Sequence, residues 1–433
     1  MTRLTTALVP LVLICAAAAE GQDVPTNSCV GRWSPPFPVQ GADGRPVYIE
    51  RGVVTVFDDR ALVLGSPTFF WLRKHHMAPP EVPADTAALR WAFTRPGALI
   101  DSNGTASGVP VVDTLRPRTK PRLVGSRRRL ATVAWAAFDS DSSGPGADPD
   151  RVDLASFDGR QWSAPRIVIR APGLRLSHGS AIRAGVEFDP AVVVVAARDA
   201  TGPFVRVARL SGERWSTVDW RGPAFIIHRA IAPATTDRSV SILMTAAMKD
   251  GATGVFSLRG EWAQDSLAWT QPKLIDSLPG AFDLSSARLG TDSVIVAWYS
   301  RPKGGAPGAL VTALSIDAGS TWTLTTPLAV RSGMDGARLV VDSAGGLHIV
   351  YRGAPEDEVD VLNAPGTIMH SYWLSGAWTP PTAVSLGSSV TAPAAGPAPR
   401  GRLMAIWADA VVVPEGAMPK SLASLWTPGC TRP

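Results

Sequence analysis

The chain has 433 residues, 45% of them hydrophobic, so it can bury a substantial core. Its formal net charge is +5, and its most basic stretch, Arg116 to Arg129, contains no aromatic residue. Such a run can attract an anion, but it lacks the side chains on which nucleic-acid bases stack. We interpret it as a solvated loop between strands and predict no nucleic-acid partner.

The N-terminus has the pattern of a secretory signal peptide over residues 1–19. Arg3 is basic, residues 4–16 are apolar, and small residues from Ala17 to Ala19 precede Glu20. A lipoprotein signal at Cys15 is the alternative, although Ile14 stands where a small residue is usual. We expect a secreted or periplasmic protein without a membrane span, because the apolar run is short and no second one follows.

Removal of the signal leaves two cysteines, Cys29 and Cys430, at opposite ends of the mature chain. An even number of cysteines in an exported protein favours a disulfide, and two separate thiols are the alternative. A bond here would enclose almost the whole chain and so restrict the unfolded state strongly.

Next along the chain comes Trp33-Ser34-Pro35-Pro36, within a predicted strand at residues 29–38. Residues 40–120 follow, with a β-rich run from Leu62 to Trp71 and a further aromatic residue at Trp91. We interpret residues 40–120 as a first four-stranded unit, and an insertion is the alternative.

Residues 121–400 repeat a tryptophan followed by serine or threonine. The intervals are 53, 54, 53 and 56 residues, between Trp162, Trp215, Trp269, Trp322 and Trp378. Short apolar runs recur in phase, including Val294 to Trp298, Leu347 to Tyr351 and Leu403 to Trp407. Around Trp298 the predicted strands are 283–288, 293–299 and 309–315, with a fourth from Trp322. Four-stranded units of this length are typical of β-propeller blades.

The last unit, residues 401–433, supplies three strands but no fourth. Trp33-Ser34-Pro35-Pro36 resembles Trp378-Thr379-Pro380-Pro381, which marks a fourth strand. The sequence therefore predicts an all-β fold: a single propeller of seven four-stranded blades, closed by the N-terminal strand. Six blades remain the alternative.

One segment carries a family resemblance. Ser315, Asp317, Gly319, Thr321 and Trp322 match the pattern S-x-D-x-G-x-T-W, so the chain resembles sialidase-type propellers with Asp-box (BNR) repeats. The resemblance implies a structural hairpin opposite the active face. It also implies an arginine triad, a tyrosine nucleophile with a glutamate, and an aspartate acid/base. The Arg-Ile-Pro motif of the family is absent from this sequence, and Tyr351 is its one nucleophile candidate, with a core aromatic as the alternative.

In propellers the loops between second and third strands lie on the ligand-binding face. Four such loops are predicted to be long: 73–88, 139–151, 353–365 and 409–420. They supply candidate binding residues at Arg73, His75, His76, Arg352, Asp357 and Glu358. Asp139, Asp141, Ser143 and Asp150 have the spacing of a calcium loop, and a solvated turn is the alternative.

No complete catalytic set is evident from the residues. The primary interpretation is a secreted binding or scaffold module for a glycan or protein ligand on the loop-rich face. A sialidase-like or diverged glycoside hydrolase is the alternative. Calcium is the one cofactor for which the sequence offers a candidate.

Overall fold

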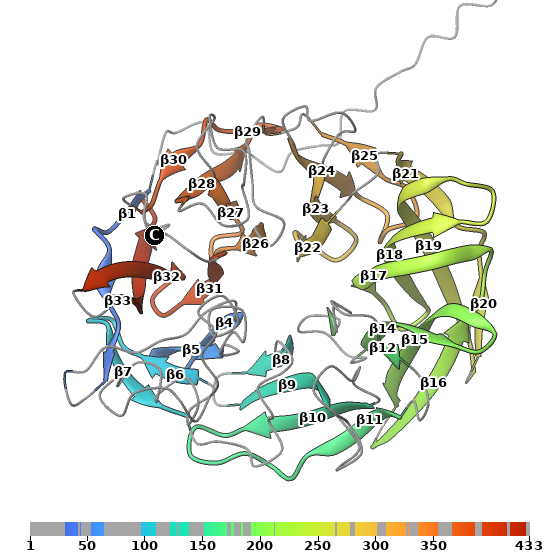
Figure 1. The fold of residues 1–433 in the computed structure, drawn as a ribbon, viewed down its shortest axis with the longest axis horizontal. Coiled ribbons are helices and arrows are strands. Elements are labelled where there is room, and N and C mark those ends of the chain that lie inside the picture. Colours follow the sequence, from blue (N-terminus) through green and yellow to red (C-terminus); the bar gives the residue numbers. More distant parts are fainter. Residues whose placement is uncertain are drawn as a thin grey trace, which may run out of the picture.

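The protein forms seven small β-sheets arranged in a ring (Figure 1). The computed structural model describes residues 31–41, 44, 53–64, 97–109, 122–127, 130–137, 151–170, 175–176, 183–184, 192–211, 213–264, 266–277, 282–300, 309–325, 328, 337–353, 366–385, 392–413 and 416–429. Within these residues the regular elements are all strands. The fold is therefore a seven-bladed β-propeller, as predicted.

We call the four strands of a blade A to D from the axis outwards. They follow in sequence order except in the last blade, where the N-terminal strand takes position D. Blade 1 contains β4 (Val53–Phe57), β5 (Arg60–Leu64), β6 (Gly97–Ile100) and β7 (Thr105–Gly108), with β3 (Gln40–Gly41) added outside. Blade 2 contains β8 (Arg122–Arg127), β9 (Leu130–Ala137), β10 (Arg151–Phe157) and β11 (Arg166–Arg170). Blade 3 contains β12 (Arg175–Leu176) and β13 (Arg183–Ala184) as its inner strand, then β14 (Val192–Asp199), β15 (Gly202–Ser211) and β16 (Arg214–Trp220).

The remaining blades follow the same plan. Blade 4 contains β17 (Ala224–Thr235), β18 (Ser239–Met248), β19 (Thr253–Ala263), β20 (Ser266–Trp269) and β21 (Lys273–Asp276). Blade 5 contains β22 (Phe282–Arg288), β23 (Val294–Ser300), β24 (Ala309–Ser315) and β25 (Thr323–Leu324). Blade 6 contains β26 (Arg338–Val341), β27 (Leu347–Gly353), β28 (Thr367–Leu374), β29 (Ala377–Trp378) and β30 (Thr382–Ala383). Blade 7 contains β31 (Ala394–Ala398), β32 (Arg402–Val413), β33 (Gly416–Thr427) and the N-terminal strands β1 (Arg32–Trp33) and β2 (Phe37–Pro38).

The N-terminal strand closes the ring, as the sequence predicts. Trp33 of β1 pairs with Trp426 of β33, and Phe37 of β2 pairs with Ala423. The amide of Ser34 also donates to the carbonyl of Leu425 at 2.8 Å. Cys29 and Cys430 lie outside the described residues, so their disulfide stays a prediction.

The core lies between neighbouring blades. The third residue from the end of strand B faces the preceding blade in blades 2 to 6, and Trp407 is its equivalent in blade 7. We call these the level residues: Trp135, Ala197, Ala246, Trp298, Tyr351 and Trp407. Four are large aromatics, and each of those four is fully buried, so they fill the wedge between blades.

Two predicted boundaries are wrong. The segment 409–420 is not a loop, because β32 and β33 pair from Leu403↔Trp426 to Val413↔Gly416. Blade 7 also begins before residue 401, because β31 is its inner strand. In blade 1, β5 covers the start of the run predicted from Leu62 to Trp71, and residues 65–96 lie outside the described residues.

The chain direction defines two faces of the ring. Successive strands of a blade run in opposite directions, so the B-to-C and D-to-A connections lie on the same face of the ring. We call this the upper face. The A-to-B and C-to-D turns share the lower face. In the described part of the chain, no helix has the length and hydropathy needed to cross a membrane.

Candidate functional site

Of the predicted rim residues, Arg352 alone falls in the described part of the chain. The others lie outside it: Arg73, His75, His76, Asp357 and Glu358, and with them the calcium-loop residues Asp139, Asp141, Ser143 and Asp150. Among the described residues, no three His, Cys, Asp or Glu side chains gather as a set of metal ligands.

Two buried arginines lie on adjacent strands of blade 6. Arg338 on β26 pairs with Val350 of β27, and Arg352 follows Val350 by two residues. Residues paired across a ladder, and residues two apart on a strand, share one face of the sheet. This face meets blade 7, because Val350 packs with Ala405 and Trp407. Arg338 is 7% exposed and Arg352 is 5% exposed, and both have further polar partners.

Blade 7 adds a buried carboxylate to the same interface. Asp409 follows Trp407 by two residues on β32, so it faces blade 6, and it is 8% exposed. Among the described residues, Asp409 Oδ1 has no hydrogen-bond partner. Burying a carboxylate oxygen without a partner is costly. The cations that blade 6 brings to this interface reduce that cost, and an unpartnered buried acid is typical of a functional position.

Charged residues also recur on the inner strands at nearly the same position along the ring axis, which we call their height. Arg122 pairs with Ala134, Arg175 with Arg198, Arg229 with Thr245 and Arg338 with Val350. Each of these partners is adjacent in sequence to the level residue of its blade. In blade 5, Asp283 lies on β22 between the pairs Phe282↔Tyr299 and Ser285↔Ala297, and therefore at the height of Trp298. Three inner strands thus place an arginine at a common height around the ring axis, Arg175 lies two residues nearer the upper face, and Asp283 lies between these heights.

Tyr351 does not belong to this group. It faces blade 5, where it packs with Ile295 and Ala297, and it also packs with Leu339 of its own blade. Its side chain is fully buried. Burial raises the pKa of its phenol well above the ordinary value. These surroundings are those of a core aromatic and do not activate a nucleophile.

The segment that matches the Asp-box pattern is a tight hairpin on the lower face. Asp317 accepts hydrogen bonds from Ser315 Oγ (2.8 Å), from the Thr321 amide (2.8 Å) and from Thr321 Oγ1 (2.7 Å). Gly319 has a φ of 84° and donates its amide to Ser315 Oγ at 2.8 Å. The Asp317 carboxylate is therefore engaged by its own turn. Asp158 and Asp101 accept backbone amides in the same way in blades 2 and 1.

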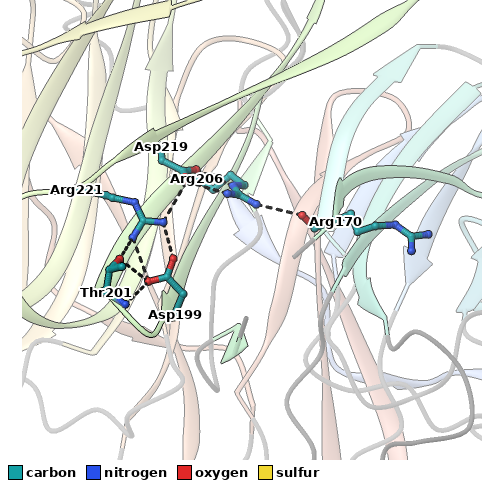
Figure 2. Close-up of polar contacts among 6 residues, drawn as sticks. All are labelled: Arg170, Asp199, Thr201, Arg206, Asp219 and Arg221. Carbon is teal, nitrogen blue, oxygen red and sulfur yellow. Dashed lines mark hydrogen bonds and ion pairs between the residues drawn. The ribbon is translucent and has the colours of Figure 1, made fainter. Parts of the chain in front are cut away.

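A second charged cluster lies on the upper face at blade 3 (Figure 2). Arg206 forms a two-pronged ion pair with Asp219, at 2.6 and 2.8 Å, and donates to the carbonyl of Arg170 in blade 2 at 3.1 Å. Arg221 pairs with Asp199 at 2.6 Å and stacks over Phe204 at 4.3 Å. Because each of these four charges already has an opposite charge as partner, the cluster ties strands together and is a weak candidate for gripping a ligand.

No protein-family model matches this chain. No curated protein matches it either.

Comparison with solved structures finds distant likenesses. A GH93 α-L-arabinofuranosidase of Fusarium graminearum, in complex with arabinobiose, is 12% identical, with a TM-score of 0.41 over 73% of this chain and 95% of that one. The NanB sialidase from Streptococcus pneumoniae is 9% identical, with a TM-score of 0.41 over 73% of this chain and 69% of that one. A Trypanosoma rangeli sialidase is 12% identical, with a TM-score of 0.38 over 76% and 57% of the two chains. Likeness at this level concerns the fold alone, so no site residue is taken from these proteins.

Sequence reasoning missed Arg338, Asp409 and Asp283 as site residues. Asp409 falls in a predicted loop, although the β-branched run Val411-Val412-Val413 directly after it is a strand signal. Arg338 and Asp283 stand at strand starts without a motif, and only the pairing register places them at one height.

Proposed function

We propose that this protein is an exported glycoside hydrolase that acts on a sugar bearing a carboxylate or similar anionic group. The observation that carries the proposal is the interface between blades 6 and 7. There, buried Arg338 and Arg352 lie on one side and the buried Asp409, with an unpartnered oxygen among the described residues, lies on the other. Export is proposed from the apolar N-terminal segment at residues 4–16.

The arginines support the choice of an anionic ligand. A guanidinium group presents parallel N–H donors that match both oxygens of a carboxylate, and it stays charged when buried. Arg122 and Arg229 lie at the height of Arg338 on other inner strands, so three basic residues share this level of the ring. Several arginines at one height suit an anion better than a neutral sugar.

The carboxylates support hydrolysis. Glycosidic cleavage requires one group that protonates the leaving oxygen and a second that activates water or attacks the anomeric carbon. We assign the first role to Asp409, which is buried at this interface and has a carboxylate oxygen without a partner among the described residues. We assign the second role to Asp283, which lies on the inner strand of the blade next to Arg338.

The test is a panel of fluorogenic glycosides, acidic and neutral, incubated with the purified mature protein. We expect turnover of acidic sugars, and a fall in kcat of about 10²- to 10⁴-fold for both Asp409→Asn and Asp283→Asn. Arg338→Lys keeps the charge but loses the two-pronged contact, so KM rises more than kcat falls. The matched control is Asp250→Asn, an exposed acid on the upper-face turn of blade 4.

Three results would argue against the proposal. Saturable binding of an acidic glycan without turnover would favour the binding-module interpretation. Equal turnover of neutral and acidic sugars would remove the assigned role of the arginines. Full activity in both aspartate variants would place the reaction elsewhere.

A further inference from the structure

Three titratable side chains form a buried chain on the lower side of blade 6. His348 Nε2 lies 3.2 Å from Asp342 Oδ2, and His348 Nδ1 lies 2.9 Å from His370 Nε2. His348 is 3% exposed and His370 is 1% exposed. Asp342 lies in the turn between β26 and β27, where it also accepts the amides of Ala344 and Gly346.

These three hydrogen-bonded side chains lie against the strands that close the ring. The ring of His370 contacts Trp33 of β1 edge-on, with centroids 5.2 Å apart, and Trp426 of β33 at 4.8 Å. His348 also contacts Trp426, at 5.4 Å. Since β1 and β33 pair to form the closure, the two histidines support the one blade that is built from both ends of the chain.

The donor and acceptor roles of these three side chains limit how many protons they can hold together. The Asp342 carboxylate accepts from His348 Nε2–H, so Nδ1 of a neutral His348 accepts from His370 Nε2–H. One added proton can be shared along this path, because a charged His348 pairs with Asp342. A second proton would place two imidazolium groups against each other in a buried site, which is unfavourable.

The surrounding groups add to this constraint. Tyr372 of β28 also contacts both histidines, with ring centroids 6.4 and 6.3 Å away. Arg32 lies on β1, and Arg400 and Arg402 lie at the β31–β32 turn of blade 7, whose Gly401 abuts Ser343 next to Asp342. Among the described residues, Asp342 is the acid and these arginines are the cations at this lower end of the interface, whereas Arg338, Arg352 and Asp409 lie at its upper end. The cations disfavour further positive charge.

We propose that the Asp342–His348–His370 chain is an acid-sensitive latch, which holds the ring closed near neutral pH and loosens β1 and β33 in acid. In acid the histidine pair takes up its second proton more readily once Trp33 and Trp426 have moved away and water has entered. The latch proposal does not rest on the proposed glycosidase site, which lies at the upper end of the same blade interface.

The direction of the pH effect follows from the two states. Burial, together with neighbouring His348, lowers the pKa of His370 to about 3, against an ordinary value of 6.5. Burial alone would raise the pKa of Asp342, but hydrogen bonds from His348 and Gly346 hold it below its ordinary value. Between pH 6.5 and about 3 the opened state therefore binds more protons at His370 than the closed state, and closure weakens as pH falls.

Hydrogen–deuterium exchange of the full mature protein at pH 7.5 and pH 4.5 tests the latch. After correction for intrinsic exchange, we expect opening of 31–38 and 416–429 to increase up to about 100-fold, that is, tenfold for each pH unit below 6.5. Amides of β18 and β19 in blade 4 should change much less. Equal loss of protection in all blades, or unchanged protection in β1 and β33, would overturn the proposal.

Variants link the effect to these side chains. His370→Gln removes the imidazole whose pKa burial lowers, so β1 and β33 should lose most of their pH dependence. His348→Gln leaves His370 buried, so it should reduce the pH dependence less. His228→Gln on β17, an exposed histidine far from the closure, should behave like wild type. If both latch variants keep the wild-type pH dependence, the histidine pair is not the sensor. If either variant fails to fold, the wild-type comparison between blades still decides.

Discussion

Replacing Gly319 by alanine tests how the hairpin at 315–322 is fixed to its neighbour. Gly319 has a φ of 84°, and a Cβ placed there would lie 2.2 Å from Ser241 Oγ and 2.5 Å from Ser241 Cβ in blade 4. The left-handed backbone costs an alanine about 1–2 kcal/mol. Forcing the buried Ser241 aside adds about 1–3 kcal/mol, as for overpacked cores. We therefore expect a total loss of about 2–5 kcal/mol.

Gly376→Ala is the matched control for this change. Gly376 occupies a turn at the same end of blade 6 with a φ of 87°, but a Cβ added there would meet nothing within 4 Å among the described residues. It should lose about 1–2 kcal/mol, the backbone cost alone. Urea unfolding at equilibrium measures both, with m-values expected to match wild type. Ser241→Gly should recover part of the Gly319→Ala loss. Equal losses for the two glycine variants would refute the claim that the hairpin is locked against blade 4.

Two further substitutions test contacts within and between blades. Trp298→Phe removes the indole donor to Asp276, which lies 2.8 Å away across blades 4 and 5, whereas Trp407→Phe removes an indole N–H that has no partner among the described residues. We expect Trp298→Phe to cost about 1.5–3 kcal/mol more than Trp407→Phe in urea unfolding, and equal costs would contradict this. Arg206→Lys loses the two-pronged contact with Asp219 and the bond to the carbonyl of Arg170, so it should cost about 1–2 kcal/mol, against almost nothing for the exposed Arg198→Lys. If Arg198→Lys lost as much stability as Arg206→Lys, the two-pronged contact with Asp219 would not be the cause of the loss.

The sequence predicted the blades well because each blade repeats the same packing problem. Strand C of blade 5 is predicted at 309–315 and is found at Ala309–Ser315. Strand B is predicted at 293–299 and found at Val294–Ser300. Apolar β-branched runs, a tryptophan at the outer strand and a turn between them recur because each sheet must bury both faces against its neighbours.

The candidate site was less predictable because it depends on pairing register between strands. Arg338 and Arg352 are fourteen positions apart in the sequence, and Asp409 lies in the next blade. None belongs to a local motif, and only the pair Arg338↔Val350 shows that the two arginines share a face. The histidine chain has the same origin, since His348 and His370 come from different strands and Asp342 comes from a turn.

The location of both proposed devices follows from how the ring is closed. Blade 7 is the one described sheet assembled from both ends of the chain. Its N-terminal strands β1 and β2 are short and can fray, so side-chain contacts with blade 6 help to hold them in place. On the upper side of that junction lie Arg352 and Asp409, and on the lower side lie His370 and Trp33. Loosening of the latch in acid should therefore reach the proposed glycosidase site through Trp407, which packs between the two blades. If the acid-induced opening of β1 and the loss of turnover occurred at different pH values, the two sides of the junction would be uncoupled.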